Sequence, residues 1–159
     1  MKIPTLYLDT SVIGGGFDDE WKDATLEFFK QAKAGLYRLE TSVVTERELQ
    51  NAPLRVQEQY AVLFPASKRV HLLTDEAESL AQAYVAAGVV TAKSTEDARH
   101  VAIATVQGIA VIVSWNFHHL ANLRREAGFN AVNLLQGYPQ VRILSPLELI
   151  HENDEDEDL

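Results

Sequence analysis

The chain has 159 residues, a usual length for one domain with one sizeable core. It contains no cysteine, so disulfides, thiolate metal sites and cysteine nucleophiles are excluded. The formal net charge is -9, and it would be -3 without the six acids of the last nine residues. Because the rest of the chain has no run rich in lysine or arginine, we do not expect a broad positively charged surface that binds nucleic acid.

The hydropathy pattern gives no sign of a membrane protein. No segment approaches the ~20 uninterrupted apolar residues that a membrane-spanning helix needs. The N-terminus lacks the apolar core and small-residue cleavage site of a signal peptide. We therefore expect a cytoplasmic protein that makes no membrane contact.

Apolar segments typical of strands alternate along the chain with amphipathic segments typical of helices. The predicted strands are 3–8, 36–39, 70–73, 110–113, 132–135 and 141–144. The predicted helices are 21–34, 42–53, 54–65, 74–88, 94–108 and 117–127, with a final helical turn at 146–150. The glycines at 14–16 are expected to form a flexible loop after the first strand, since the Gly-Lys-Ser/Thr ending of a phosphate-binding loop is absent.

This alternation predicts an α/β fold with three layers, α/β/α, around a central parallel sheet of about four or five strands. The predicted domain covers residues 1–150. Residues 151–159 are the one break in composition, and this acidic tail is expected to be disordered.

Four polar residues lie where such a sheet would bring them together. Asp9 follows the first strand, Glu48 lies in the helix after the second, and Asn116 follows the fourth. Asp97 lies in the first turn of the helix before the fourth strand. Sites in parallel sheets form at the carboxyl ends of strands. Mg²⁺ and Mn²⁺ prefer oxygen ligands, so a divalent metal site is a reasonable hypothesis.

Each of these residues also has a purely structural interpretation. Asp9 could form an Asx turn after the strand. Glu48 could be a solvated helix residue, and Asp97 could complete a capping box with Ser94. Asn116 could cap the helix predicted to start at residue 117. The functional interpretation depends on all four occurring in order on one strand and helix framework.

The sequence blocks LDTSVI, SVVTEREL, EDARHVAIAT and VSWNFHHL, in this order, resemble a PIN domain. The resemblance covers roughly residues 3–150. PIN domains include the toxin nucleases of prokaryotic toxin–antitoxin pairs. The resemblance implies that the metal-binding acids of the family correspond to Asp9, Glu48 and Asp97. It also places the fourth family position, often aspartate or asparagine, on Asn116.

Several neighbouring residues leave alternatives open. Glu46 and Glu48 point about 200° apart around a helix, so only one should face the site, and the family spacing favours Glu48. His118 and His119 are expected to be exposed helix residues, with a phosphate contact as the alternative. Trp115 is expected to pack in the core or at its rim rather than stack on a base.

The resemblance predicts a Mg²⁺- or Mn²⁺-dependent endoribonuclease that uses a metal-activated water to attack an RNA phosphodiester. The expected partners are an RNA substrate and an antitoxin protein, and a homodimer is left open. Two other functions are alternatives. One is an inactive PIN-like module that binds RNA or protein, and the other is a metal-dependent phosphatase acting on small molecules.

Overall fold

A computed structural model of the protein describes residues 2–116 and 122–152. Its five strands form one parallel sheet in the order β3-β2-β1-β4-β5. The strands are β1 (Thr5–Leu8), β2 (Arg38–Ser42), β3 (Val70–His71), β4 (Val111–Val113) and β5 (Arg142–Leu144). The predicted parallel sheet is confirmed.

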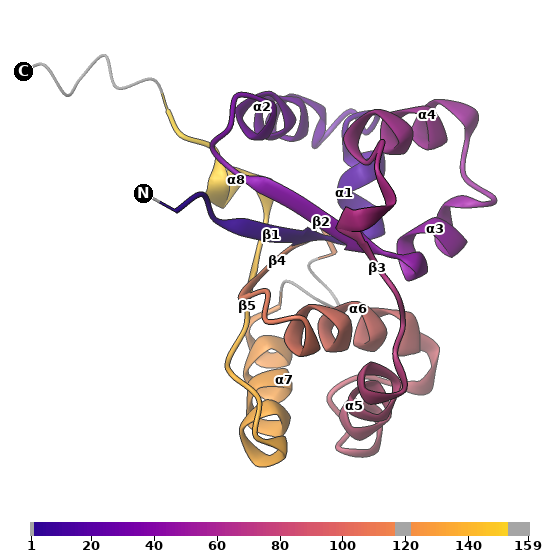
Figure 1. The fold of residues 1–159 in the computed structure, drawn as a ribbon, viewed down its shortest axis with the longest axis vertical. Coiled ribbons are helices and arrows are strands. Elements are labelled where there is room, and N and C mark those ends of the chain that lie inside the picture. The colour runs from indigo at the N-terminus through magenta and orange to yellow at the C-terminus, as the bar shows by residue number, and fades with distance from the viewer. Residues whose placement is uncertain (1, 117–121, 153–159) are drawn as a thin grey trace, which may run out of the picture.

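Helices cover both faces of the sheet and complete the predicted α/β/α layers (Figure 1). On one face lie α1 (Thr10–Gly15), α2 (Lys22–Lys33), α3 (Val43–Leu49) and α4 (Leu54–Leu63), with the short α8 (Pro146–Leu149) beside α2. On the other lie α5 (Asp75–Ala86), α6 (Thr95–Val106) and α7 (Leu123–Gln136). Short 3-10 turns occupy Ser67–Arg69 and Ala92–Ser94. Within the described residues, no helix is both long and apolar enough to span a membrane.

The central strand β1 divides the core into two parts. Successive strand side chains point to opposite faces of a sheet. Leu6 and Leu8 accordingly pack with Val12 and Phe28 on the side of α1 and α2, whereas Tyr7 packs in the cluster formed with α5, α6 and α7. All three side chains of this run are buried, as expected for a parallel strand covered on both faces.

The strand order places a topological switch point beside β1. The chain moves from β1 to β2 on one side, and later returns to β4 on the other side. The loops after β1 and β4 therefore diverge, and such a crevice at the carboxyl ends is where ligands bind in open α/β sheets. Leu8 pairs with Val113, so Asp9 and Ser114 follow at the same edge.

The prediction of a loop at 14–16 is wrong, because Gly14 and Gly15 belong to α1. A Cβ added at Gly15 would lie 2.8 Å from Thr25 Oγ1 and 2.8 Å from Trp115 Cδ1. The glycine therefore lets α1 approach α2 and the end of β4 closely, instead of providing flexibility.

The predicted strand at 132–135 is also wrong, because this segment is the second half of α7. Phe129, Val132 and Asn133 are buried at helical spacing on one face. Gly128 does not end the helix, and a Cβ there would meet Val89 Cγ1 at 3.0 Å. The helix ends before Gly137, which has a left-handed φ of 83°.

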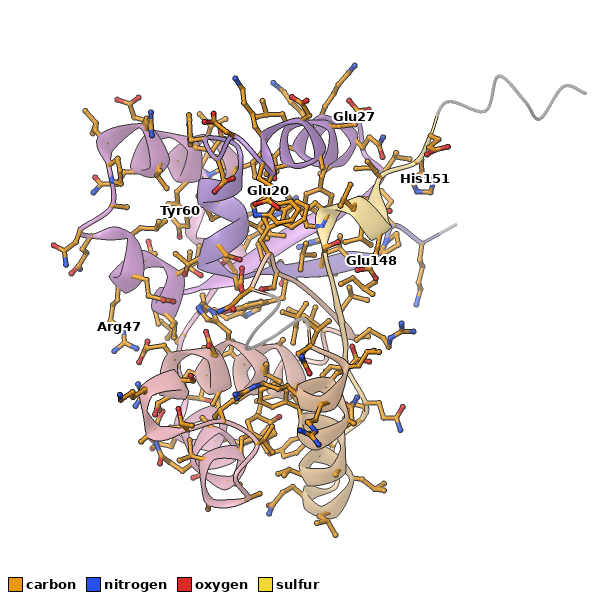
Figure 2. The ribbon with its side chains drawn as sticks, turned by 180° about the vertical axis from the view of Figure 1, so that it is seen from behind. Glu20, Glu27, Arg47, Tyr60, Glu148 and His151 are labelled. Carbon is orange, nitrogen blue, oxygen red and sulfur yellow. The ribbon has the colours of Figure 1, made fainter. Side chains whose placement is uncertain are left out.

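The ordered contacts of the domain reach the start of the acidic tail. The backbone N–H of His151 donates to Gln31 Oε1 at 2.7 Å, and Gln31 Nε2 donates to the His151 carbonyl at 2.8 Å. The His151 ring stacks on Tyr37 with centroids 6.0 Å apart. His151 thus lies against α2, close to α8 (Figure 2).

Candidate active site

Asp9 is buried at the carboxyl end of β1, where it precedes α1. Its backbone N–H donates to the Val113 carbonyl at 3.2 Å, which extends the sheet contact by one residue. Ser11 Oγ donates to Asp9 Oδ1 at 2.6 Å. Burial raises the pKa of the Asp9 carboxyl, although nearby His100 and the hydrogen bond from Ser11 oppose this effect. An isolated negative charge is therefore unfavourable here, and a cation would relieve it.

Glu48, on the last turn of α3, is held by two donors from other elements. Thr10 Oγ1 donates to Glu48 Oε1 at 2.8 Å, and His100 Nε2 lies 2.6 Å from the same oxygen. Burial acts to raise the pKa of Glu48, but the hydrogen bonds from His100 and Thr10 and the charges of His100 and Arg47 together outweigh it, so the pKa is lowered. With 34% of its side chain exposed, Glu48 is reachable from solvent but is not a freely solvated helix residue.

His100, on α6, is the buried centre of this arrangement, with 2% of its surface exposed. Its Nδ1 lies 2.6 Å from the Tyr7 hydroxyl, which lies 2.7 Å from Ser42 Oγ. Burial acts to lower the pKa of His100. The hydrogen bond to Glu48 and the negative charges of Asp9, Glu48 and Asp97 outweigh burial, so the pKa is raised.

Asp97 and Asn116 lie at the edges of the same region. Asp97 is half-buried in the first turn of α6, three residues before His100, and its charge acts on that imidazole. Asn116 is half-buried after β4, and its backbone N–H donates to Ser114 Oγ at 2.9 Å. The predicted helix start at residue 117 lies outside the described residues, as do His118 and His119.

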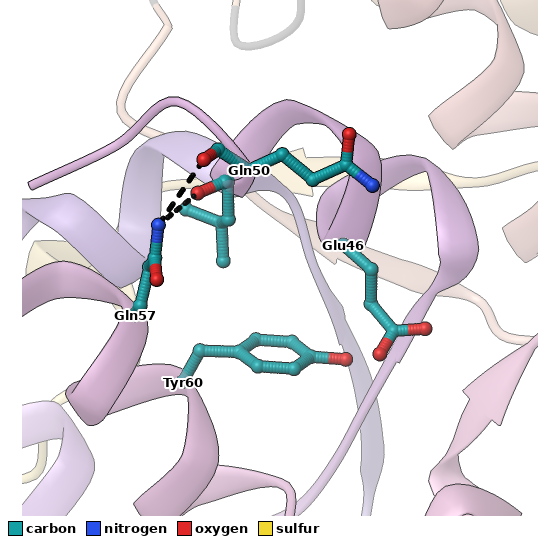
Figure 3. Close-up of a pocket in the computed structure, with 5 residues that line it drawn as sticks. Glu46, Gln50, Gln57 and Tyr60 are labelled. Carbon is teal, nitrogen blue, oxygen red and sulfur yellow. Dashed lines mark hydrogen bonds between the residues drawn. The ribbon is translucent and has the colours of Figure 1, made fainter. Parts of the chain in front are cut away.

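Glu46 belongs to a different surface from Glu48. It lines a pocket of about 330 Å³ between α3 and α4, together with Leu49, Gln50, Gln57 and Tyr60. Its carboxylate points toward the hydroxyl end of Tyr60 (Figure 3). The Tyr60 hydroxyl is buried, and burial together with the nearby Glu46 raises its pKa. The two glutamates of α3 therefore have separate environments.

Trp115 packs at the rim of the core, as predicted. Its ring stacks on Trp21 with centroids 4.3 Å apart, and its Nε1 donates to Thr25 Oγ1 at 2.8 Å. The Trp115 backbone N–H donates to Ser11 Oγ at 2.9 Å. Since Ser11 also donates to Asp9, the packing of Trp115 is connected to the site through a single serine.

Neither a family model nor a curated protein matches the chain. Two solved structures nevertheless resemble it over most of its length. The structure of FitAB bound to an IR36 DNA fragment has a TM-score of 0.58 at 12% identity, and the match covers 94% of this chain and 99% of that one. The crystal structure of FitAcB from Neisseria gonorrhoeae has a TM-score of 0.57 at 12% identity, with 89% and 98% covered. The chain has a PIN-like fold. At this identity the likeness concerns the fold, and at that level it supports the resemblance that the four sequence blocks indicated.

The charges of Asp9, Glu48 and Asp97 all act on His100, but within the described residues these side chains do not complete a metal cluster. Carboxylate oxygens suit Mg²⁺ and Mn²⁺. Yet across residues 2–116 and 122–152, no group of three acidic, histidine or cysteine side chains is arranged to hold a metal ion. The metal, and the roles of Asp9, Glu48 and Asp97 as its ligands, therefore stay predictions.

Sequence reasoning missed the residues that hold Glu48, namely Thr10 and His100, and Tyr7, which contacts His100. A signal for His100 was present, because it lies three residues after Asp97 on the same helix and inside the apolar run HVAIAT. A buried polar side chain in such a run needs a hydrogen-bond partner. The sequence does not identify that partner, because Glu48 lies 52 residues away in the chain.

Proposed function

We propose that the protein is a metal-dependent endoribonuclease of the PIN toxin type. The observation that carries the proposal is the 2.6 Å contact between Glu48 and the buried imidazole of His100. The charges of Asp9, Glu48 and Asp97 all act on His100, beside the switch point of a parallel sheet. Like charges brought together at a crevice favour binding of a cation.

The donor set suits Mg²⁺ or Mn²⁺, with Asp9, Glu48 and Asp97 as the residues that would hold it. A bound divalent ion would supply an activated water and stabilise charge on the scissile phosphate. The residues of the chain have supporting roles. Ser11 orients Asp9, while Thr10 and His100 orient Glu48. Asn116 would offer a neutral amide at the end of the neighbouring strand.

The partners belong to the same proposal. The resemblance to PIN toxins implies an RNA substrate and an antitoxin protein. The likeness to FitAB and FitAcB, the former bound to DNA, supports looking for a protein partner of this chain. A homodimer is the alternative assembly of the purified protein. Co-expression with the product of the neighbouring gene, followed by size-exclusion chromatography, tests for the protein partner.

Cleavage of a mixed RNA substrate with Mn²⁺ or Mg²⁺, and with EDTA as control, tests the activity. We expect fragments with the wild type and none with Asp97→Asn. Glu96→Gln is the matched control, because Glu96 is the preceding acid of α6 and pairs with Arg99. An active Asp97→Asn variant would refute the mechanism. Inhibition of RNA cleavage by a phosphomonoester that is itself hydrolysed would favour the phosphatase.

The neutral amide of Asn116 and the lack of any run rich in lysine or arginine favour a second candidate. This is a PIN-like module that binds RNA or protein without cutting. An RNA mobility shift that occurs equally with metal and with EDTA, without any cleavage, would support this module over the nuclease.

A further inference from the structure

The two hydrogen bonds that Glu48 receives within the described residues end on the same atom. Thr10 Oγ1 donates to Oε1 at 2.8 Å, and His100 Nε2 approaches Oε1 at 2.6 Å. A carboxylate has two oxygens with about four acceptor positions. Since both donors approach Oε1, the hydrogen bonds among the described residues leave Oε2 open to another ligand.

The other ring nitrogen of His100, Nδ1, is also hydrogen-bonded. It contacts the hydroxyl of Tyr7, and that hydroxyl contacts Ser42 Oγ. The rings of Tyr7 and His100 meet edge to face with centroids 5.7 Å apart. Tyr7 is fully buried in the central strand and Ser42 is fully buried at the end of β2. The imidazole therefore has little freedom to turn, and its direction is set by the sheet.

The hydrogen-bond network assigns Nε2 of His100 as the donor. Glu48 Oε1 accepts, so Nε2 must carry a proton. Nδ1 can then accept from the Tyr7 hydroxyl, or donate to it when the ring is doubly protonated, with Tyr7 donating to Ser42. The contact with Glu48 is the same in both cases, and the argument does not depend on which protonation state is present.

We propose that His100 is a positioning residue, which together with Thr10 fixes Oε1 of Glu48 so that Oε2 is presented to a divalent cation. This inference rests on the proposed function, because it concerns the same metal. It adds that Glu48 would bind the cation through Oε2 alone. It also adds that buried Tyr7 orients His100, which in turn orients the Glu48 carboxylate. Residues that orient metal ligands typically change metal affinity by 10- to 100-fold when they are substituted.

An opposite role for His100 predicts the opposite result. If the imidazole only neutralised Glu48 and blocked it, its removal would free the carboxylate and tighten cation binding. Any positive charge on His100 would also repel the cation, so losing that charge acts in the same direction. A loss of affinity on removal of His100 therefore points to positioning, since neither blocking nor charge repulsion can produce it.

The test is calorimetric titration of Mn²⁺ alone into the metal-free full chain, at constant ionic strength and well below the unfolding midpoint. The variants are His100→Leu, which removes the donor, and His100→Gln, whose side-chain amide can place a neutral donor near the position of Nε2. Thr10→Val removes the second donor to Oε1. Apo unfolding midpoints are recorded for each variant, so that a purely structural effect appears there and leaves the Kd unchanged.

We expect His100→Leu to weaken Mn²⁺ binding about 10- to 100-fold, Thr10→Val to weaken it less, and His100→Gln to keep most of the affinity. Unchanged or tighter binding in His100→Leu, with a wild type that binds, would overturn the positioning role and leave the proposed function intact. A wild type that binds no Mn²⁺ would overturn both. If His100→Leu does not fold, unchanged or tighter Mn²⁺ binding in Thr10→Val would overturn the proposal that these two donors fix Oε1 of Glu48.

Discussion

His100 Nε2 lies 2.6 Å from Oε1 of Glu48, and this contact distinguishes the two glutamates of α3. Glu46, two residues earlier, points instead toward Tyr60 on α4 (Figure 3). The angular separation predicted for a helix is thus realised as two separate surfaces. It follows that a matched pair of substitutions on one helix can test which surface is functional.

We expect Glu48→Gln to remove most RNA cleavage and Glu46→Gln to leave it nearly unchanged. The first substitution removes a charge beside His100, whereas the second changes only the pocket shared with Tyr60. Initial rates of cleavage at saturating Mn²⁺ provide the measurement. If Glu46→Gln instead removed more activity than Glu48→Gln, the active site would lie on the Glu46 side of α3.

Asp9→Asn should abolish cleavage while leaving the metal-free protein as stable as the wild type, or more stable. Burial raises the pKa of Asp9, so its negative charge is unfavourable without a cation. The asparagine carbonyl can still accept the hydrogen bond that Ser11 donates. Thermal unfolding in EDTA, alongside the cleavage assay, checks both halves. A large drop in the midpoint would show that the charge of Asp9 is needed for folding instead.

Asn116→Asp should tighten Mn²⁺ binding and destabilise the metal-free protein if Asn116 belongs to the site, because it adds a negative charge near Asp9. Asn116→Ala should reduce cleavage less than Asp97→Asn, since water can replace an amide ligand. Metal titrations and EDTA unfolding curves of the two Asn116 variants give the answer. Unchanged affinity in Asn116→Asp, combined with a stable apo form, would remove Asn116 from the site.

Gly15→Ala should destabilise the fold by roughly 1 to 3 kcal/mol, the usual range for overpacking. The new Cβ would lie 2.8 Å from both Thr25 and Trp115, and the latter is connected to Asp9 through Ser11. Gly14→Ala is the matched control in the same helix, because its Cβ would meet nothing within 4 Å. It should stabilise the protein by about 0.5 to 1 kcal/mol. Denaturant unfolding measures both, and equal effects would contradict the close packing of α1.

Truncation should show where the domain contacts end. Removing everything after Glu152 should leave the unfolding midpoint unchanged. Removing everything after Ile150 should lower stability by about 1 kcal/mol or more, since Gln31 loses its two hydrogen bonds with the backbone of His151. Comparison of the two truncated chains by thermal unfolding is sufficient. A large loss on the shorter truncation would assign a structural role to the acidic segment.

Much of the fold could be predicted from local patterns. The apolar run Leu6-Tyr7-Leu8 is typical of a strand buried on both faces, and it is one. The alternation of such runs with amphipathic segments predicted the parallel sheet and its helical layers, and the strand ends correctly placed Asp9 and Asn116 after β1 and β4. These features depend on residues close in sequence, so periodicity is enough to find them.

The failures occurred where packing between distant segments overrode local preference. Glycine is a common helix end, yet α7 continues through Gly128 because the absent Cβ lets it approach Val89. In the same way, Gly15 lies inside α1. Its missing side chain lets Thr25 and Trp115 pack closely against that helix. Helix propensity is a weak preference that tertiary contacts routinely outweigh.

The sequence by itself determined the strand and helix framework and the carboxylates at its edge. Only the tertiary structure decided how those carboxylates are held. Tyr7, Glu48 and His100 come from a strand and two different helices, and their contacts join residues 52 and 93 positions apart. No periodicity relates such positions. Their meeting depends on strand order and on how α3 and α6 pack against β1, and these are settled only when the whole core forms.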